Sequence, residues 1–268
     1  MKVGDISRKI FLRASSEDYM MPVLPVIQEK GFGKALVFDD GEFTGVVSKE
    51  TFLDNRGLMK EKPLSELKVK DFVDENVSMI DSESNAFKGV DMLLTTSMRV
   101  DTVVVEKDGL VCGYLTSKEY TSHCNEKLGG RFKVKDLMHY NPDFVYDYTP
   151  LEDVIRKATD HMAKYLVVLR GKEVVGVITV KDLMLTLFHH HSREESPYGL
   201  TAEEVMSKPA ITISEKADCV EAGNLMMEKS IGSLPITDEV EGVKGVISRR
   251  DLLKGFEILK QESVDFKL

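Results

Sequence analysis

The sequence predicts an α/β fold made of four copies of one unit, each a small sheet with flanking helices, paired into two larger modules. Three observations predict it: four glycine-anchored motifs at near-equal spacing, an apolar hairpin pattern before each glycine, and a helical pattern before each hairpin. The anchor glycines are Gly45, Gly113, Gly176 and Gly245, which are 68, 63 and 69 residues apart. Self-similarity at a fixed period is the signature of a repeat architecture.

The same elements are expected in the same order in every unit. Each unit opens with a short amphipathic turn, at residues 3–6, 69–72, 134–138 and 202–206. A short strand follows, at 143–146 in the third unit and 210–213 in the fourth. Apolar residues at helical spacing come next, for example Leu151, Val154 and Ile155 in the third unit, whereas Gly223 interrupts the helical pattern of the fourth.

A hairpin and a second helix close each unit. Two β-rich runs surround a polar turn that contains glycine, and the first runs begin near residues 34, 101, 164 and 233. The second run contains the anchor glycine, and Ser or Thr follows three residues later. The third and fourth units then place Asp three residues further on, so that each motif reads Gly-x-x-Ser/Thr-x-x-Asp at the start of a helix.

One unit of this size is too small for a stable core, so the units are expected to pair. We predict one pair over residues 1–124, with repeats at about 1–58 and 64–124. The second pair spans 131–268, with repeats at about 131–190 and 199–260. The polar stretch 125–130 is the predicted linker, and residues 189–197 join the last two repeats.

Composition excludes several classes of protein. The net charge of −9 argues against general nucleic-acid binding, which needs Lys and Arg to neutralise phosphates. No apolar run is long enough to span a membrane, and the N-terminal residues lack a signal-peptide core, so we expect a cytoplasmic protein. Three scattered cysteines form no CxxC pair, and the adjacent His189, His190 and His191 cannot all face one ion, so we expect no metal.

The order strand, helix, hairpin and the closing Gly-x-x-Ser/Thr-x-x-Asp motif resemble the cystathionine-β-synthase (CBS) domain family. The resemblance covers nearly the whole chain and is strongest in the last two repeats, where residues 233–238 are similar to the second-strand signature of the family. Four such repeats form two Bateman modules, a layout also found in the gamma subunits of AMP-activated protein kinases.

The resemblance implies a non-catalytic regulatory sensor that binds AMP, ADP or ATP between paired repeats and acts on a partner protein, with no required cofactor. In the family the motif Asp accepts hydrogen bonds from ribose, its Ser/Thr and the residue before the Asp meet ribose or phosphate, and strand backbone reads adenine. Carried over, this gives the ribose and phosphate residues Thr179, Lys181, Asp182, Ser248, Arg250 and Asp251. The adenine would lie against the backbone of Ile211, Thr212, Leu234 and Pro235.

The chemistry of the motif residues supports an anion at this place. A helix N-terminus has free N–H groups and a favourable dipole, and Lys181, Arg249 and Arg250 add positive charge there. A carboxylate suits a vicinal diol because it is an acceptor facing two donors. Lys164, just before the second strand, is a further phosphate ligand candidate, whereas its counterpart Lys34 is expected to be an exposed strand-edge lysine.

Other interpretations stay open. Ser/Thr-x-x-Asp at a helix start is also a capping box, which binds no ligand. The first pair ends its motifs in Thr51 and Glu119, so we expect it to be structural or to bind weakly. The alternatives are an S-adenosylmethionine sensor, or a nucleic-acid- or protein-binding regulator with vestigial nucleotide sites. The second would use a basic patch of Arg131, Lys133, Arg249 and Arg250. A homodimer is also an open alternative.

Overall fold

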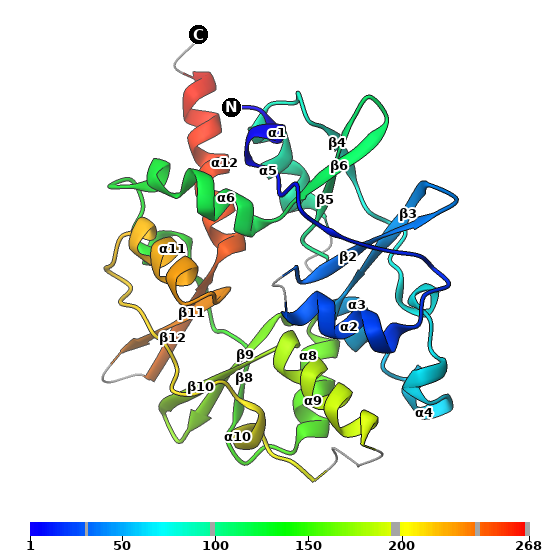
Figure 1. Cartoon of the computed structure of the whole chain (residues 1–268). Coiled ribbons are helices and arrows are strands. Elements are labelled where there is room, and N and C mark those ends of the chain that lie inside the picture. The colour runs from blue at the N-terminus through cyan, green and yellow to red at the C-terminus, as the bar shows by residue number, and fades with distance from the viewer. Residues whose placement is uncertain (30–31, 97–99, 194–198, 239–241, 266–268) are drawn as a thin grey trace.

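The computed structural model describes residues 1–29, 32–96, 100–193, 199–238 and 242–265. It contains four three-stranded sheets with helices on their faces, which confirms the predicted fold class (Figure 1). The prediction for residues 189–197 lies partly outside the described residues.

The first two repeats contain the elements α1 to η3. The first has α1 (Val3–Ile6), β1 (Leu12–Ala14), α2 (Met20–Glu29), β2 (Lys34–Asp39), β3 (Glu42–Ser48), α3 (Lys49–Asp54), α4 (Leu58–Glu61) and η1 (Leu64–Glu66). The second has η2 (Val69–Phe72), β4 (Met79–Asp81), α5 (Ala86–Thr95), β5 (Val103–Lys107), β6 (Leu110–Leu115), α6 (Ser117–Cys124) and η3 (Asn125–Leu128).

The last two repeats contain the elements α7 to α12. The third has α7 (Val134–Leu137), β7 (His139–Tyr140), β8 (Phe144–Tyr146), α8 (Leu151–Asp160), β9 (Tyr165–Arg170), β10 (Glu173–Thr179) and α9 (Val180–Ser192). The fourth has α10 (Ala202–Val205), α11 (Cys219–Glu228), β11 (Ser233–Asp238), β12 (Gly242–Ser248) and α12 (Arg249–Asp265).

The strand predicted at residues 210–213 is wrong. This segment forms a single bridge, Ile213 with Ile236, in which the Ile213 N–H donates to the Pro235 carbonyl over 3.1 Å. Pro235 has no backbone N–H, so it cannot donate a second hydrogen bond back to a carbonyl of the 210–213 segment. The third strand of this sheet is β7, which the third repeat contributes.

Paired repeats exchange their opening segments. Arg8 of the first repeat bridges to Tyr114 of the second, and Asp74 of the second bridges back to Val46 of the first. The last two repeats do the same through β7 on β12 and through Ser207 on Val177. Each sheet is therefore extended by its partner repeat.

The anchor glycine of each repeat allows this exchange. A Cβ built on Gly113 would lie 2.6 Å from the Arg8 carbonyl oxygen, and one on Gly245 would lie 2.6 Å from the His139 carbonyl oxygen. Gly45 meets the Asp74 carbonyl oxygen at the same distance. At these three positions glycine is required by close approach of the partner backbone, whereas a Cβ on Gly176 would first meet the Met206 side chain.

The two pairs join helix to helix around a common centre (Figure 1). Helix α3 packs against α9, and α12 packs against α5 and α6, so the first repeat meets the third and the second meets the fourth. Met184 of α9 lies in the core of the first repeat, and Leu53 of α3 lies in the core of the third. A single chain thereby forms a closed ring of four repeats.

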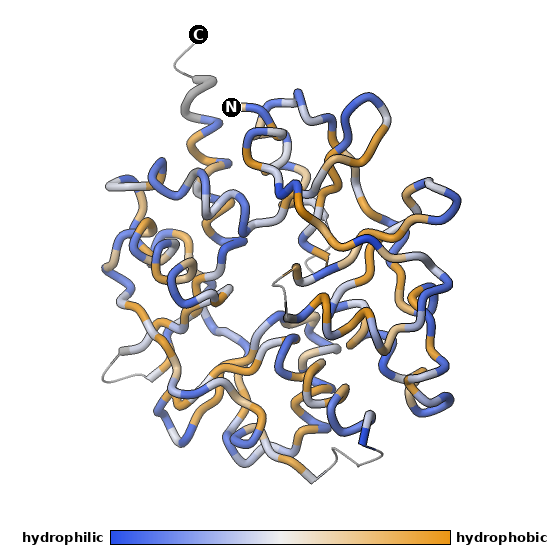
Figure 2. Tube along the Cα trace, viewed as in Figure 1, coloured by the Kyte–Doolittle hydropathy of each residue, from blue (hydrophilic) through white to orange (hydrophobic). Residues whose placement is uncertain are grey.

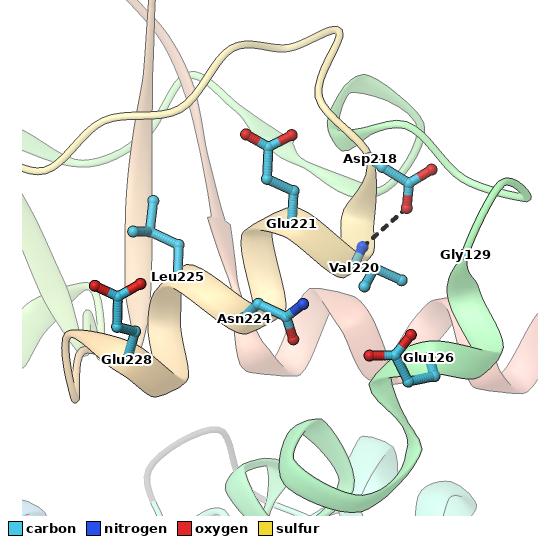
Figure 3. Close-up of a pocket in the computed structure, with 8 residues that line it drawn as sticks. All are labelled: Glu126, Gly129, Asp218, Val220, Glu221, Asn224, Leu225 and Glu228. Atoms are coloured by element: carbon cyan, nitrogen blue, oxygen red, sulfur yellow. Dashed lines mark hydrogen bonds between the residues drawn. The ribbon is translucent and has the colours of Figure 1, made fainter.

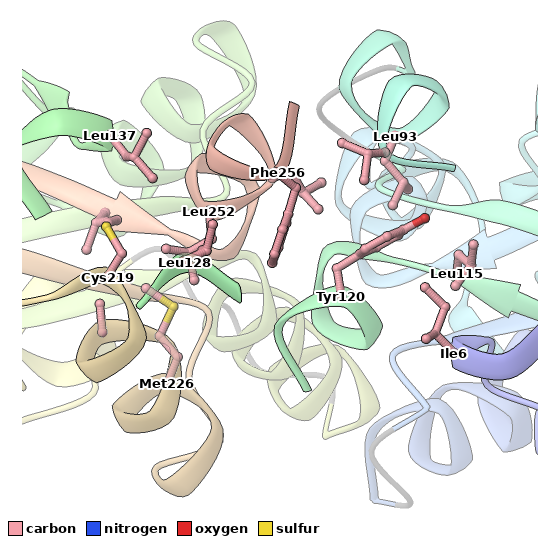
Figure 4. Packing of buried hydrophobic residues seen from close by; sticks show 14 of the residues in the cluster. Ile6, Leu93, Leu115, Tyr120, Leu128, Leu137, Cys219, Met226, Leu252 and Phe256 are labelled. Atoms are coloured by element: carbon pink, nitrogen blue, oxygen red, sulfur yellow. The ribbon is translucent and has the colours of Figure 1, made fainter. Parts of the chain in front are cut away.

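The largest core is formed by the second and fourth repeats together with α1 and α7. The rings of Tyr120 in α6 and Phe256 in α12 have centroids 6.3 Å apart within this cluster (Figure 4). Figure 2 shows hydrophobic residues along the strands and hydrophilic residues in the hairpin turns. Burial of apolar surface between the pairs therefore fixes the positions of the residues at the centre.

Candidate functional site at the centre of the four repeats

The strand–helix junctions of all four repeats form capping boxes. The N-cap and N3 residues are Ser48 with Thr51, Thr116 with Glu119, Thr179 with Asp182, and Ser248 with Asp251. In each junction, the N3 side-chain oxygen accepts a hydrogen bond from the backbone N–H of the N-cap residue. The capping interpretation is therefore confirmed at every junction, including the Ser48–Thr51 junction, which offers no carboxylate.

In the third repeat, donors from the protein reach both oxygens of Asp182. The backbone N–H and the hydroxyl of Thr179 donate to Asp182 Oδ2 over 2.7 and 2.6 Å. The Ser207 hydroxyl donates to Oδ1 over 3.2 Å. Asp182 is half-buried and Lys181 is exposed. To bind Asp182 Oδ1, a ribose diol would have to replace the 3.2 Å hydrogen bond from the Ser207 hydroxyl.

In the fourth repeat, Asp251 is more enclosed. Its side chain accepts from the Ser248 N–H (2.9 Å) and hydroxyl (2.7 Å) and pairs with Lys254 Nζ at 2.7 Å. Asp251 is only 6 % exposed. Tyr165 lies beside it, and burial together with the charge of Asp251 raises the pKa of the tyrosine hydroxyl. The exposed Lys254 is the partner that a ligand could displace.

The predicted adenine-contacting residues have mixed surroundings. Leu234 and Pro235 are buried in β11, and the Pro235 carbonyl already accepts from Ile213. Ile211 is half-buried against the shared core, and Thr212 is exposed. Contact of their backbone with adenine stays a prediction.

The two arginines do not form the surface patch required by the nucleic-acid alternative. Arg249 Nη2 donates to the Met226 carbonyl over 3.1 Å. Arg250 Nη2 donates to the Leu94 and Thr96 carbonyls, over 2.9 and 3.1 Å, at the C-terminal end of α5. Both side chains are directed inward, and Arg250 links the fourth repeat to the second.

Residues at or just before the first strand of the hairpins bring charge to the centre. Lys34 is 7 % exposed, so its assignment as an exposed strand-edge lysine is wrong. Its ammonium donates to the carbonyls of Val100 and Asp101, both over 3.3 Å, and to Thr102. Lys34 is buried because the second repeat covers the start of β2, a tertiary contact that sequence periodicity does not report.

Asp101 of the second repeat lies close to cations of the third and fourth repeats. Its Oδ2 lies 3.9 Å from Lys164 Nζ and accepts from the Ser117 hydroxyl over 2.7 Å. Its Oδ1 lies 4.0 Å from Arg250 Nη1. We call Lys34, Lys49, Glu50, Asp101, Lys164 and Arg250 the central cluster. These residues come from all four repeats.

Mutual charge and burial shift the pKa values in the central cluster. Burial lowers the pKa of Lys34 to about 8 despite the nearby Asp101 and Glu50. Burial also lowers the pKa of Lys164. Burial alone would raise the pKa of Asp101, but Lys164 and Lys34 hold it at about 2. The cluster thus holds four cations and two anions in surroundings where charge is poorly solvated.

The cations of the central cluster keep unused hydrogen-bonding capacity. Arg250 Nη1 and Asp101 Oδ1 are buried and have no hydrogen-bond partner among the described residues. Lys164 Nζ makes no hydrogen bond within that part of the chain; it lies 3.9 Å from Asp101 Oδ2 and is also attracted by Glu50. Buried donors without partners are costly, so an anion that accepts from them would be bound favourably.

A hollow lies elsewhere, between η3 and α11 (Figure 3). It has a volume of about 570 Å³, and Glu126, Asp218, Glu221 and Glu228 surround it together with Gly129, Val220, Asn224 and Leu225. None of the lining residues that the structure describes is basic. A second hollow of about 370 Å³ lies between β8 and α8. Neither contains Asp182 or Asp251, and the acidic lining of the first is unsuited to phosphate.

The three histidines lie in the last turn of α9. His191 Nε2 accepts from the Leu64 N–H over 3.1 Å and so links the third repeat to the first. Among the described residues no group of three or more His, Cys, Asp or Glu is arranged to hold a metal ion. Over the same residues, the helices are too short or too polar to cross a bilayer.

The fold and its repeated junctions define a class of protein, a ring of small α/β repeats that complete each other's sheets in pairs. The family model of the CBS domain matches residues 134–189 and 202–257. These two segments are therefore a tandem pair of CBS domains in the second half of the chain.

Similar proteins share this architecture over almost the whole chain. Protein MJ1225 of Methanocaldococcus jannaschii is 23% identical over 259 residues, which cover 93% of this chain and 91% of that protein. Its crystal structure, presented as that of a proposed archaeal homologue of g-AMPK, matches with a TM-score of 0.86 at 21% identity, over 96% of this chain and 100% of that one. A conserved protein from Pyrococcus horikoshii matches with a TM-score of 0.66 at 18% identity, over 95% and 99% of the two chains. These likenesses extend the shared fold to the first two repeats.

Proposed function

We propose that this protein is a non-catalytic sensor that binds an adenine nucleotide, AMP, ADP or ATP, and signals its presence to a partner protein. The observation that carries the proposal is the central cluster. It is a half-buried group of net positive charge, with unused donors, in a protein whose overall net charge is −9.

The fourth-repeat junction is the favoured place for the nucleoside. Asp251 follows Arg250 directly, and Tyr165 next to Asp251 follows Lys164 directly. A ribose held by Asp251 would therefore direct its 5′-phosphate toward Lys164 and Arg250. Ser248 would add a hydroxyl, and the Tyr165 ring would offer an apolar wall.

The third-repeat junction, with Thr179, Lys181 and Asp182, is proposed as a second and more open position. Lys181 is exposed there, so a phosphate at this position would stay in contact with water. Charge attraction through water is weak, and we expect lower affinity. We take residues 1–124 and 131–268 as the two modules whose relative position would report occupancy.

Isothermal titration with AMP, ADP, ATP and S-adenosylmethionine tests the proposal. Asp251→Ala should weaken nucleotide binding by about 1–3 kcal/mol, because a hydrogen bond to a charged group is lost. Asp182→Ala should affect only a second, weaker binding step. No heat with any of the four ligands at millimolar concentration would end the proposal. Unchanged affinity in both variants would show that the two acids are caps only.

Proton uptake gives an independent test of the location of the phosphate. A phosphate beside Lys34 would raise its pKa from about 8, so binding at pH 8 should draw protons from the buffer. Titrations in two buffers of different ionisation enthalpy measure this uptake. Lys34→Met should abolish it, and the same uptake in the variant would place the phosphate elsewhere.

A further inference from the structure

Asp101 differs in charge from its counterparts in the other repeats. The strand register aligns Asp101, which lies just before the first hairpin strand, with Gly33, Lys164 and Gly232 of the other repeats. One counterpart is a cation, two are glycines, and only the second repeat places an acid at this position. The side chain of Asp101 is 17 % exposed and lies between Lys164 and Arg250.

We propose that Asp101 determines the ligand specificity of the central cluster, because its fixed negative charge occupies the place that an additional ligand phosphate would take. The inference rests on the proposed function and names the class of ligand: nucleoside monophosphates are favoured over triphosphates.

The distances show that Asp101 is surrounded by cations without being locked to them. Its oxygens lie 3.9 Å from Lys164 and 4.0 Å from Arg250, whereas charge-assisted N–H···O bonds are about 2.7–2.9 Å long. Asp101 Oδ1 and Arg250 Nη1 face each other and have no hydrogen-bond partner in the described part of the chain. Oxygen acceptors of a ligand would therefore compete with this carboxylate for the same donors.

The charge balance of the cluster sets the preference. Lys34, Lys49, Lys164 and Arg250 carry four positive charges, and Glu50 and Asp101 carry two negative charges. The net charge of the cluster is therefore +2, and one phosphate monoester, which carries about −1.5 to −2 at pH 7, would balance it. A triphosphate brings about twice that charge, and its excess would lie against Asp101 in poorly solvated surroundings.

Asp101→Asn is a conservative test of this role. Asn keeps the shape and can still accept the hydrogen bond from Ser117, and it tolerates the positive φ of 41° at this position. Asp108→Asn is the matched control, since Asp108 has a φ of 53°, lies in the exposed β5–β6 turn of the same repeat, and loses the same charge. Asp101→Gly is a second neutral variant that accepts the same backbone conformation.

Affinities for AMP and ATP are measured by titration for the unaltered protein and the three variants. We expect Asp101→Asn to tighten ATP binding by about tenfold and AMP binding by about twofold, because each added ligand charge is released from repulsion. Asp108→Asn should leave both affinities unchanged. An ATP-to-AMP affinity ratio within twofold of the original in both neutral variants would overturn the proposal.

Inorganic phosphate and tripolyphosphate are titrated in parallel, since they need no adenosine site. If no nucleotide binds but tripolyphosphate binds more tightly to Asp101→Asn, the proposed function fails and the role of Asp101 holds. If nucleotides bind with an unchanged ratio, the role of Asp101 fails and the function holds. Absence of binding by every anion overturns both.

Discussion

The central cluster and the hollow between η3 and α11 both gather charged side chains, but under opposite conditions. The centre joins charges of both signs from four repeats, and Lys34 and Glu50 there are less than a tenth exposed. The charged residues that line the hollow are all acidic, and Glu126, Glu221 and Glu228 are exposed to solvent.

The difference shows why the hollow between η3 and α11 is a weaker candidate for a site than the central cluster. Water screens exposed charges, so they contribute little to stability or binding. Buried charges depend on each other and on any ligand that reaches them, and removing one leaves another uncompensated. Burial, more than the number of charges, makes the central cluster the stronger candidate for binding a charged ligand.

Arg250→Ala is expected to have the largest effect, because it breaks the centre. The variant loses the hydrogen bonds to Leu94 and Thr96 and the cation nearest Asp101 Oδ1. We expect the free energy of unfolding in urea to fall by about 3 kcal/mol. Arg170→Ala is the control, because Arg170 has two ion pairs at the surface and is 53% exposed, and its loss should leave stability near the original value. Equal effects of the two substitutions would contradict the comparison.

Lys34 makes stability depend on pH in a defined window. Its pKa is about 8 when folded and 10.5 as a free side chain, so between these values the unfolded chain binds more protons and stability rises with pH. The full rise corresponds to about 3 kcal/mol at most.

The measurement is denaturant unfolding of the protein and of Lys34→Met from pH 7 to 10.5. The stability of the unaltered protein should increase relative to the variant across this range. Parallel curves for the two proteins would mean that Lys34 is solvated and that the centre resembles the hollow.

Gly223→Ala probes the packing of α11 against η3, next to the hollow. A Cβ at Gly223 would overlap the side chain of Asn125, which donates to the Val220 carbonyl over 2.8 Å and to Asn224 Oδ1 over 3.0 Å. We expect a loss of about 2 kcal/mol from overpacking. The double variant with Asn125→Ala should lose less than the sum of the single variants, since the clash is relieved. Additive losses would show that Asn125 does not restrain α11.

Local signals predicted much of this architecture. The anchor glycines, the hairpin turns and the capping boxes are short-range patterns, and the structure shows each of them at its expected residues. The Gly223 irregularity also has a cause, because the close contact with Asn125 leaves no room for a side chain. The strand at 210–213 was wrong because Pro235 lies on the neighbouring strand, and its missing N–H matters only once the pairing is known.

The centre could not be predicted in the same way. The burial of Lys34, the inward direction of Arg249 and Arg250, and the position of Asp101 all depend on how the repeats dock. Periodicity within one repeat reports the face of a strand or helix, and does not report which other repeat covers it. One signal was present: Asp101 and Lys164 share one position in the repeat and Lys34 lies one residue further on, so a ring of four repeats brings them together.

The smallest effect is expected from a Glu→Gln substitution, which can be made both in the hollow and in the central cluster. Glu221→Gln in the hollow should change the free energy of unfolding by less than about 0.5 kcal/mol, as for most exposed positions. Glu50→Gln in the centre should cost about 1–2 kcal/mol, because Glu50 is 6 % exposed by side chain and pairs with Lys49 Nζ at 2.6 Å. Lys49 and Lys164, with Lys34, keep the pKa of Glu50 low in spite of its burial, so neutralising it leaves these cations in excess. Urea unfolding at low and high salt measures both variants. A larger loss for Glu221→Gln would mean that the acidic wall of the hollow supports the fold and that the centre does not depend on its anions.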